Sequence, residues 1–335
     1  LFGPDGYKLS DEDEVAIEES MSETTKDLAV PEELGRARRL YDAPGRYIEF
    51  VKQTFPKGFR LDGLKIVLDC SNGAAYKVAP SVLWELGAEV IPIAITPDGT
   101  NINKKCGATD PAYMCECLRK EQADIGIALD GDADRVIIAD ENGTLLDGDQ
   151  LMAVIVESLQ SQGRLCGNGI VTTVMSNLGL ERFLKSLGLK LFRTAVGDRY
   201  VVEEMRKRNL NVGGEQSGHI ILRDYITTGD ALIAALQILA ALVREEKSLS
   251  DLGHAFEAVP QKLVNIDTSG SVPLDSGKVQ KAIRDGEKQL GEKGRLVIRA
   301  SGTEPVVRIM AQGDDEKLIC EVINNVSVAI EKAVR

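Results

Sequence analysis

Short apolar runs alternate with longer stretches of mixed polarity between residues 65 and 246. The runs are typical of buried strands, and the stretches between them carry the three-to-four-residue apolar spacing of helices. Strands are predicted over 65–70, 88–94, 124–130, 169–175 and 190–196. The turn at residues 141–143 predicts a hairpin between 135–140 and 144–146. Helices are predicted over 111–123, 148–163, 176–188, 197–209 and 229–246. Because strands followed by helices form parallel layers, this order predicts two α/β domains, over residues 46–147 and 148–257.

The pattern changes after residue 257. A strand, a helix near 276–290, two more strands and a final helix predict a small α+β domain over 258–335. Residues 1–45 are polar, with an acidic run after Ser10 that is typical of a helix N-terminus, and they hold too little apolar surface for a core of their own. We therefore expect a multi-domain α/β protein with two mixed or parallel α/β domains and a C-terminal α+β domain. Residues 1–45 would be the C-terminal remnant of a preceding α/β domain.

Composition and charge limit the classes of partner and the cellular location that can be expected for the chain. The chain has 335 residues and a net charge of −12, which disfavours nucleic acid and anionic membranes as partners. It contains no apolar run of about 18 residues, so a membrane span is not expected. The start "LFGPDGYKLS" is not a signal peptide, and its missing Met suggests that the chain begins within a longer protein. The six cysteines show neither CxxC nor zinc spacing, which predicts reduced thiols and a cytoplasmic location.

The stretch "ALDGDADRVIIAD" carries three alternate carboxylates directly after a predicted strand, Asp130, Asp132 and Asp134, followed by Arg135. A turn of this kind can direct all three at one hard cation, and Mg²⁺ suits carboxylate oxygen. Arg135 offers a fork for a phosphate on the same ion. A Ca²⁺-binding EF-hand is excluded, because Arg135 occupies the place of the turn glycine. A phosphatase of the haloacid-dehalogenase type, with Asp130 as nucleophile, stays open on these residues alone.

Two further loops offer polar groups for a sugar. In "GGEQSGH", Glu215, Ser217 and His219 alternate along what reads as an extended segment, where they can bind hydroxyl groups. In "VGDRY", Gly197 and Asp198 are expected at a helix N-terminus, where α/β proteins commonly bind ligands. A glycine-rich hairpin and an ordinary helix cap are the alternatives for these two segments.

The segment "RASGTEPVVR" lies between the last two predicted strands. Guanidinium groups, hydroxyls and a glycine amide close together fit a phosphate monoester. The candidate phosphate ligands are Arg299, Ser301, Gly302, Thr303 and Arg308. The chain contains no GxxxxGK[ST] loop, so a nucleoside triphosphate is not indicated.

Taken in this order, "DGDADR", "VGDRY", "GGEQSGH" and "RASGTEPVVR" resemble the α-D-phosphohexomutases, and the resemblance covers nearly the whole chain. It implies four domains around a cleft, and phosphate transfer from a phosphoserine through a bisphosphorylated sugar. The closest branch interconverts glucosamine 6-phosphate and glucosamine 1-phosphate for cell-wall precursors, although these residues would also serve mannose or glucose phosphates. The oligomeric state stays open.

The resemblance also implies residue roles. The three aspartates would hold Mg²⁺ against the phosphoserine, and Arg135 would steady its phosphoryl group. Glu215 and Ser217 would bind sugar hydroxyls, with His219 nearby for proton transfer, and the "RASGT" residues would hold the phosphate that is not transferred.

One departure from the family pattern matters. The family serine lies in a "(T/S)ASHNP" loop, and no such segment occurs in the chain. The segment "LFGPDGYKLS" resembles the stretch that comes after that loop in the family. We therefore expect this chain to be inactive alone, although its parent enzyme would be a mutase. A non-catalytic sugar-phosphate binder is the remaining alternative.

Overall fold

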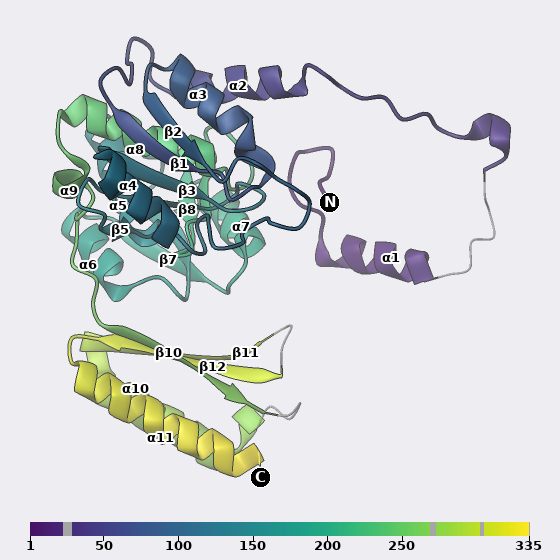
Figure 1. The fold of residues 1–335 in the computed structure, drawn as a ribbon. Helices are drawn as coiled ribbons and strands as arrows, with labels where there is room; N and C mark the ends of the chain where they lie inside the picture. The colour runs from purple at the N-terminus through teal and green to yellow at the C-terminus, as the bar shows by residue number, and fades with distance from the viewer. Residues whose placement is uncertain (23–28, 269–272, 302–304, 335) are drawn as a thin grey trace.

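The computed structural model describes residues 1–22, 29–268, 273–301 and 305–334 (Figure 1). The first α/β unit holds a five-stranded sheet in the order β2-β1-β3-β4-β5. Strands β2, β1 and β3 are parallel, whereas β4 and β5 form the antiparallel hairpin that the sequence predicts. The strands are β1 (Lys65–Asp69), β2 (Glu89–Ile93), β3 (Ile125–Leu129), β4 (Val136–Ala139) and β5 (Leu145–Leu146).

The second α/β unit repeats this plan with four strands in the order β7-β6-β8-β9, of which only β9 is antiparallel. The strands are β6 (Gly169–Thr173), β7 (Lys190–Thr194), β8 (Val212–Gly214) and β9 (Ile220–Leu222). Both sheets are mixed, as expected. The helices of the two units are α2 (Ala43–Thr54), α3 (Val78–Glu85), α4 (Ala112–Glu121), α5 (Gly148–Ser161), α6 (Leu178–Ser186), α7 (Asp198–Arg208), α8 (Ala231–Glu245) and α9 (Leu249–Leu252).

Helix α8 joins the two units into one core. Every residue from Ala231 to Leu242 is buried, because the helix packs against β3 and β4 of the first sheet and β9 of the second. Helix α2 was missed in the sequence, and it packs on α3 and α8 through Val51 and Thr54. A helix that is apolar all round must be covered on every side. The two α/β units therefore share one large hydrophobic core.

The C-terminal unit is an antiparallel sheet, β10-β12-β11, with two helices on one face (Figure 1). Its elements are β10 (Gln261–Asp267), α10 (Gly277–Leu290), β11 (Gly294–Ala300), β12 (Val306–Gly313) and α11 (Glu316–Val334). Val307, Ile309 and Ala311 alternate along β12 and are buried with Val322 and Val326 of α11 in a separate core. This is the small α+β domain that the sequence predicts.

The N-terminal segment lies against α7. Its helix α1 (Asp11–Ser22) follows Ser10, as the acidic run predicts, and Lys8 bonds to Asp198. The guanidinium of Arg206 lies 4.0 Å from the centre of the Tyr7 ring. Within the described residues, no helix combines the length and hydrophobicity needed to cross a bilayer.

Candidate active site

The three aspartates of the sequence motif converge where β3 ends. One carboxylate oxygen from each of Asp130, Asp132 and Asp134 lies within 4.8 Å of the others. The loop turns tightly because Ala133 adopts a positive φ of 62° and donates its amide to Asp130 O at 3.1 Å. Asp130 Oδ1 accepts the backbone N–H groups of Asp134 and Arg135, both at 3.1 Å. These bonds hold the acidic cluster in place.

The cluster carries uncompensated negative charge. Burial, together with the charges of Asp134 and Asp132, raises the pKa of Asp130 to about 6. The Nε of Arg135 lies 3.4 Å from Asp130 Oδ2 and 3.5 Å from Asp134 Oδ1, so one guanidinium contacts two of the three acids. Oxygen donors in this number, with a raised carboxyl pKa, fit a hard divalent cation such as Mg²⁺.

His219 joins this cluster from the second α/β unit. Its Nδ1 lies 3.1 Å from Asp134 Oδ2 and its Nε2 lies 3.6 Å from Asp198 Oδ2. The hydrogen bond to His219 is the main reason that the pKa of Asp134 is lowered. The imidazole is 4% exposed, so it is enclosed between the two carboxylates.

In the "GGEQSGH" segment the structure shows the hairpin alternative and not a continuous extended segment. It is not extended after Gly214, because Gly218 donates its N–H to Glu215 O at 3.0 Å and closes a turn. Gly218 has φ +94°, and a Cβ there would meet Val136 O at 2.2 Å. The turn therefore points His219 toward the aspartates and leaves Glu215 and Ser217 together, with Ser217 Oγ 3.3 Å from Glu215 Oε2.

The "VGDRY" loop contacts the same turn. Gly197 is the N-cap of α7, Asp198 is its first residue, and Gly197 donates its N–H to Glu215 Oε1 at 3.0 Å. Both predicted residues thus lie at the helix N-terminus. The contacts bring together two loops that are separated in sequence, at the carboxyl ends of β7 and β8.

The phosphate segment is only partly described. Arg299 and Arg308 face each other as register partners on β11 and β12, and the Ser301 amide donates to Val306 O at 2.9 Å. Gly302 and Thr303 lie outside the described residues. Burial and the charge of Arg308 lower the pKa of Arg299, whereas the charge of Glu215 raises it. The Glu215 carboxylate therefore lies within electrostatic reach of Arg299.

Two contributions were missed in the sequence. Lys8 Nζ lies 2.5 Å from Asp198 Oδ2, and Gln261 on β10 donates to Gln216 Oε1 at 3.1 Å. Each contact joins segments far apart in the chain, and a lone Lys or Gln gives no local signal of such a partner.

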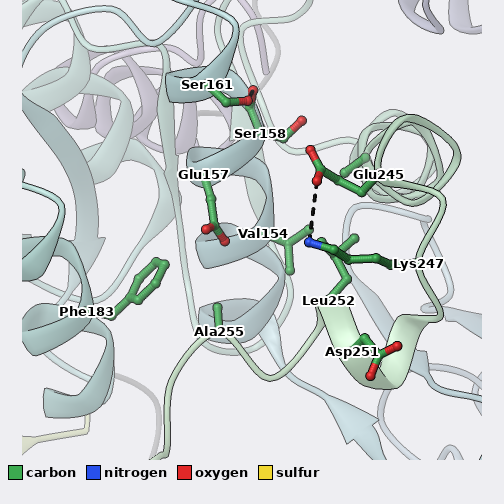
Figure 2. Close-up of a pocket in the computed structure, with 11 residues that line it drawn as sticks. Val154, Glu157, Ser158, Ser161, Phe183, Glu245, Lys247, Asp251, Leu252 and Ala255 are labelled. Carbon is green, nitrogen blue, oxygen red and sulfur yellow. Dashed lines mark hydrogen bonds and ion pairs between the residues drawn. The ribbon is translucent and has the colours of Figure 1, made fainter.

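A separate cavity of about 430 Å³ lies between α5, α8 and the segment around α9. Figure 2 shows Phe183 and Leu252 beside it, with Glu157 and Asp251 among its acidic residues and Lys247 bonded to Glu245. The described residues that line it include none from the aspartate, "VGDRY" or "GGEQSGH" loops. It is therefore distinct from the candidate active site.

The domain order, the aspartate loop and the facing arginine pair define a phosphohexomutase fold. Three domains of the phosphoglucomutase/phosphomannomutase family match the chain. They are alpha/beta/alpha domain II over 45–143, alpha/beta/alpha domain III over 147–259 and the C-terminal domain over 259–327. The chain belongs to this family.

Two similar curated proteins are both named phosphoglucosamine mutase. That of Parvibaculum lavamentivorans is 60% identical over 99% of this chain and 74% of its own length. That of Caulobacter vibrioides is 58% identical over 99% of this chain and 75% of its own.

Solved structures share the fold at lower identity. A phosphoglucomutase/phosphomannomutase family protein from Burkholderia thailandensis matches with a TM-score of 0.73 and 21% identity, over 88% of this chain and 65% of its own length. Aspergillus fumigatus N-acetylphosphoglucosamine mutase, solved with GlcNAc-6P and magnesium, matches with a TM-score of 0.67 and 20% identity. The match covers 85% of this chain and 68% of that protein's chain.

Proposed function

We propose that this chain carries the metal, sugar and phosphate sites of a mutase that interconverts glucosamine 6-phosphate and glucosamine 1-phosphate. The proposed route runs through a phosphoserine and a bisphosphorylated sugar. The observation that carries this proposal is the meeting of Asp134 and His219, at 3.1 Å, from two loops of two α/β units. The high identity to proteins named phosphoglucosamine mutase supports the amino sugar as substrate.

Asp130, Asp132 and Asp134 would hold the divalent cation. When bound, Mg²⁺ neutralises charge on the phosphoryl group, which is the main requirement of phosphoryl transfer. Arg135 borders the same carboxylates and would fix the orientation of that phosphoryl group through its planar fork. His219 would hold a proton beside Asp134 while fixing the direction of that carboxylate.

Glu215 and Ser217 would bind the sugar hydroxyls, because their side chains lie together at the turn. The N-terminal residues of α7, Gly197 and Asp198, would border the sugar. Arg299 and Arg308, with Ser301 and the "GT" residues next to it, would bind the phosphate that is not transferred. Two arginines side by side supply the positive charge that a phosphate dianion needs.

The amino sugar is one of several substrates that this chemistry accommodates. Phosphomannomutase or phosphoglucomutase specificity is the alternative within the family, since a carboxylate and a hydroxyl bind any sugar ring. Calorimetric titration of the chain with glucosamine 6-phosphate, mannose 6-phosphate and glucose 6-phosphate tests this in the presence of Mg²⁺. We expect glucosamine 6-phosphate to bind most tightly. Tighter binding of mannose 6-phosphate or glucose 6-phosphate would reassign the substrate.

Turnover needs a nucleophile. Because the chain has no "(T/S)ASHNP" segment, we expect no interconversion when the 335-residue polypeptide is incubated with glucosamine 6-phosphate, the bisphosphate and Mg²⁺. Phosphorus NMR detects both sugar phosphates and inorganic phosphate in one spectrum. Formation of glucosamine 1-phosphate at an enzymatic rate would contradict this expectation. Release of inorganic phosphate with a trapped aspartyl-phosphate would instead support the phosphatase alternative with Asp130 as nucleophile.

A further inference from the structure

Arg295 on β11 and Gln312 on β12 are register partners, and both donate hydrogen bonds to the same acceptor, the carbonyl oxygen of Ser176. We propose that these two residues, termed the anchor pair, position the C-terminal domain so that Arg299 and Arg308 reach the sugar phosphate. The proposal rests on the proposed function, because it names residues that act on phosphate binding from outside the site.

The contacts of the anchor pair are specific. Arg295 Nη1 lies 3.3 Å from Ser176 O and its Nη2 lies 3.2 Å from Val174 O. Gln312 Nε2 lies 3.2 Å from Ser176 O, and Gln312 Oε1 accepts the backbone N–H of Leu178. Gln312 is fully buried. Each side chain thus makes two bonds to the backbone of the segment from Val174 to Leu178, between β6 and the start of α6.

That segment borders the proposed active site. It follows β6, the strand that lies between β7 and β8 in the second sheet. The loops after β7 and β8 are the "VGDRY" and "GGEQSGH" loops, and Val174 donates its N–H to Thr194 O at 2.9 Å. Because β6, β7 and β8 are parallel, their carboxyl ends share one edge of the sheet. The anchor pair therefore attaches to the edge at which the sugar would bind.

The anchor pair and the arginine pair lie on one face of the C-terminal sheet. Side chains alternate between faces along a strand, so Arg295 and Arg299 of β11 share a face. Their register partners on β12 are Gln312 and Arg308. The opposite face carries Leu296, Ile298 and Ile309, which pack against the two helices. The face that carries both pairs thus has the attachment at one end and the arginines about 13 Å away at the other, with Val297 and Met310 between them.

Two positively charged side chains lie close together at the anchor pair. Arg193 also donates to Ser176 O, at 3.0 Å, so two guanidinium groups converge on one carbonyl. Burial and the charge of Arg193 lower the pKa of Arg295 to about 10. Glu181 bonds to Arg193 at 2.8 Å and balances one of the two charges. An apolar side chain at position 295 would avoid this repulsion, so the arginine is explained by the bonds that it donates.

The test compares Arg295→Met with Arg284→Met, which removes an exposed arginine from α10 of the same domain. Calorimetry measures the Kd for glucosamine 6-phosphate. Electron paramagnetic resonance of Mn²⁺ measures cation binding at the aspartates, which lie outside the C-terminal domain. We expect Arg295→Met to weaken glucosamine 6-phosphate at least 10-fold with Mn²⁺ affinity unchanged. Arg284→Met should leave both unchanged. Arg295→Lys should restore part of the lost affinity, because an ammonium can donate to one or both carbonyls.

The outcomes separate the two proposals. If the unsubstituted chain does not bind glucosamine 6-phosphate, the proposed function fails. If it binds and Arg295→Met binds equally well, the anchor proposal fails. Equal losses of sugar-phosphate and Mn²⁺ affinity would show that the substitution disturbs the whole structure, and this result would also overturn the anchor proposal. If Arg295→Met does not fold, Arg295→Lys decides, with about a 3-fold weakening expected and unchanged affinity contradicting the proposal.

Discussion

The Nδ1 atom of His219 lies 3.1 Å from Oδ2 of Asp134, and this contact joins the second α/β unit to the aspartate loop of the first. Backbone contacts reinforce it, since Val136 donates its N–H to Gly218 O at 3.1 Å. The geometry of the acidic cluster therefore depends on the neighbouring domain. This dependence makes the first prediction possible.

Replacing His219 with Ala should weaken divalent-cation binding without removing a ligand. The imidazole orients Asp134 and lowers its pKa, and loss of such a supporting group commonly costs about 10-fold or more in affinity. Mn²⁺ resonance measures the Kd directly. The matched control is His254→Ala, since that second histidine is largely exposed and lies 3.5 Å from Asp140. Equal Mn²⁺ affinity in both variants would show that His219 does not support the aspartates.

Asp132→Asn tests the cation site directly. Asp132 is the exposed member of the cluster, so its substitution should leave the fold intact while removing one charged ligand. We expect the affinity for Mn²⁺ to fall by about 10- to 100-fold and the melting temperature in its absence to change little. Asp285→Asn on α10 removes another exposed carboxylate and should have no effect on Mn²⁺ binding. A cation site elsewhere would make the two variants alike.

Asp149 predicts a pH dependence of stability. Burial, with the charge of Asp147, raises its pKa to about 7, above the value of ~3.9 in an unfolded chain. Between these values the folded state retains a proton that the unfolded state has lost. The free energy of unfolding should therefore fall as pH rises from about 4 to 7, by up to ~1.4 kcal/mol per pH unit, and then level off.

Asp149→Asn should remove that slope, because an amide side chain does not titrate in this range. The fold should persist, because the amide oxygen can still accept the Asn177 N–H that the carboxylate accepts at 2.7 Å. Urea unfolding at several pH values measures the difference between the variant and the unsubstituted chain. Asp285→Asn serves again as the control for a lost surface charge. Parallel pH profiles for the chain and Asp149→Asn would place the titration elsewhere.

Gly218→Ala should separate close packing from backbone strain. An added Cβ would meet Val136 O at 2.2 Å, and the φ of +94° disfavours any side chain. Gly188 also has a positive φ, +74°, but open space around it. We expect Gly218→Ala to cost at least ~2 kcal/mol of stability and Gly188→Ala about 1 kcal/mol. Chemical denaturation measures both, and similar losses would mean that the Gly218 contact relaxes freely.

The sequence predicted features that depend on neighbouring residues. The short apolar runs predicted strands β1, β2, β3, β6 and β7 of the two α/β units. Alternate aspartates after β3 predicted a carboxylate cluster that the structure confirms. Helix α2 was missed because its apolar face becomes evident only where it packs on α3 and α8. The sequence left the "GGEQSGH" segment open between an extended segment and a glycine-rich hairpin, since glycine permits both.

Contacts between distant segments were beyond sequence patterns. Lys8 and Asp198 are separated by 190 residues, and Ser176 and Gln312 by 136. Nothing in the local sequence marks Arg295 as different from other polar residues that alternate along a strand. Such pairs are set by how the domains pack, so they become visible only in three dimensions.

The attachment at Ser176 gives the C-terminal sheet the mechanics of a lever arm. With the fulcrum at Arg295 and the tip at Arg299, about 13 Å along the strand, a tilt of only ~10° would carry the tip through roughly 2 Å. The fulcrum itself would hardly move, so its hydrogen bonds could persist. A small tilt of the sheet about this attachment would therefore move Arg299 and Arg308 while leaving the aspartates, which lie outside the C-terminal domain, in place.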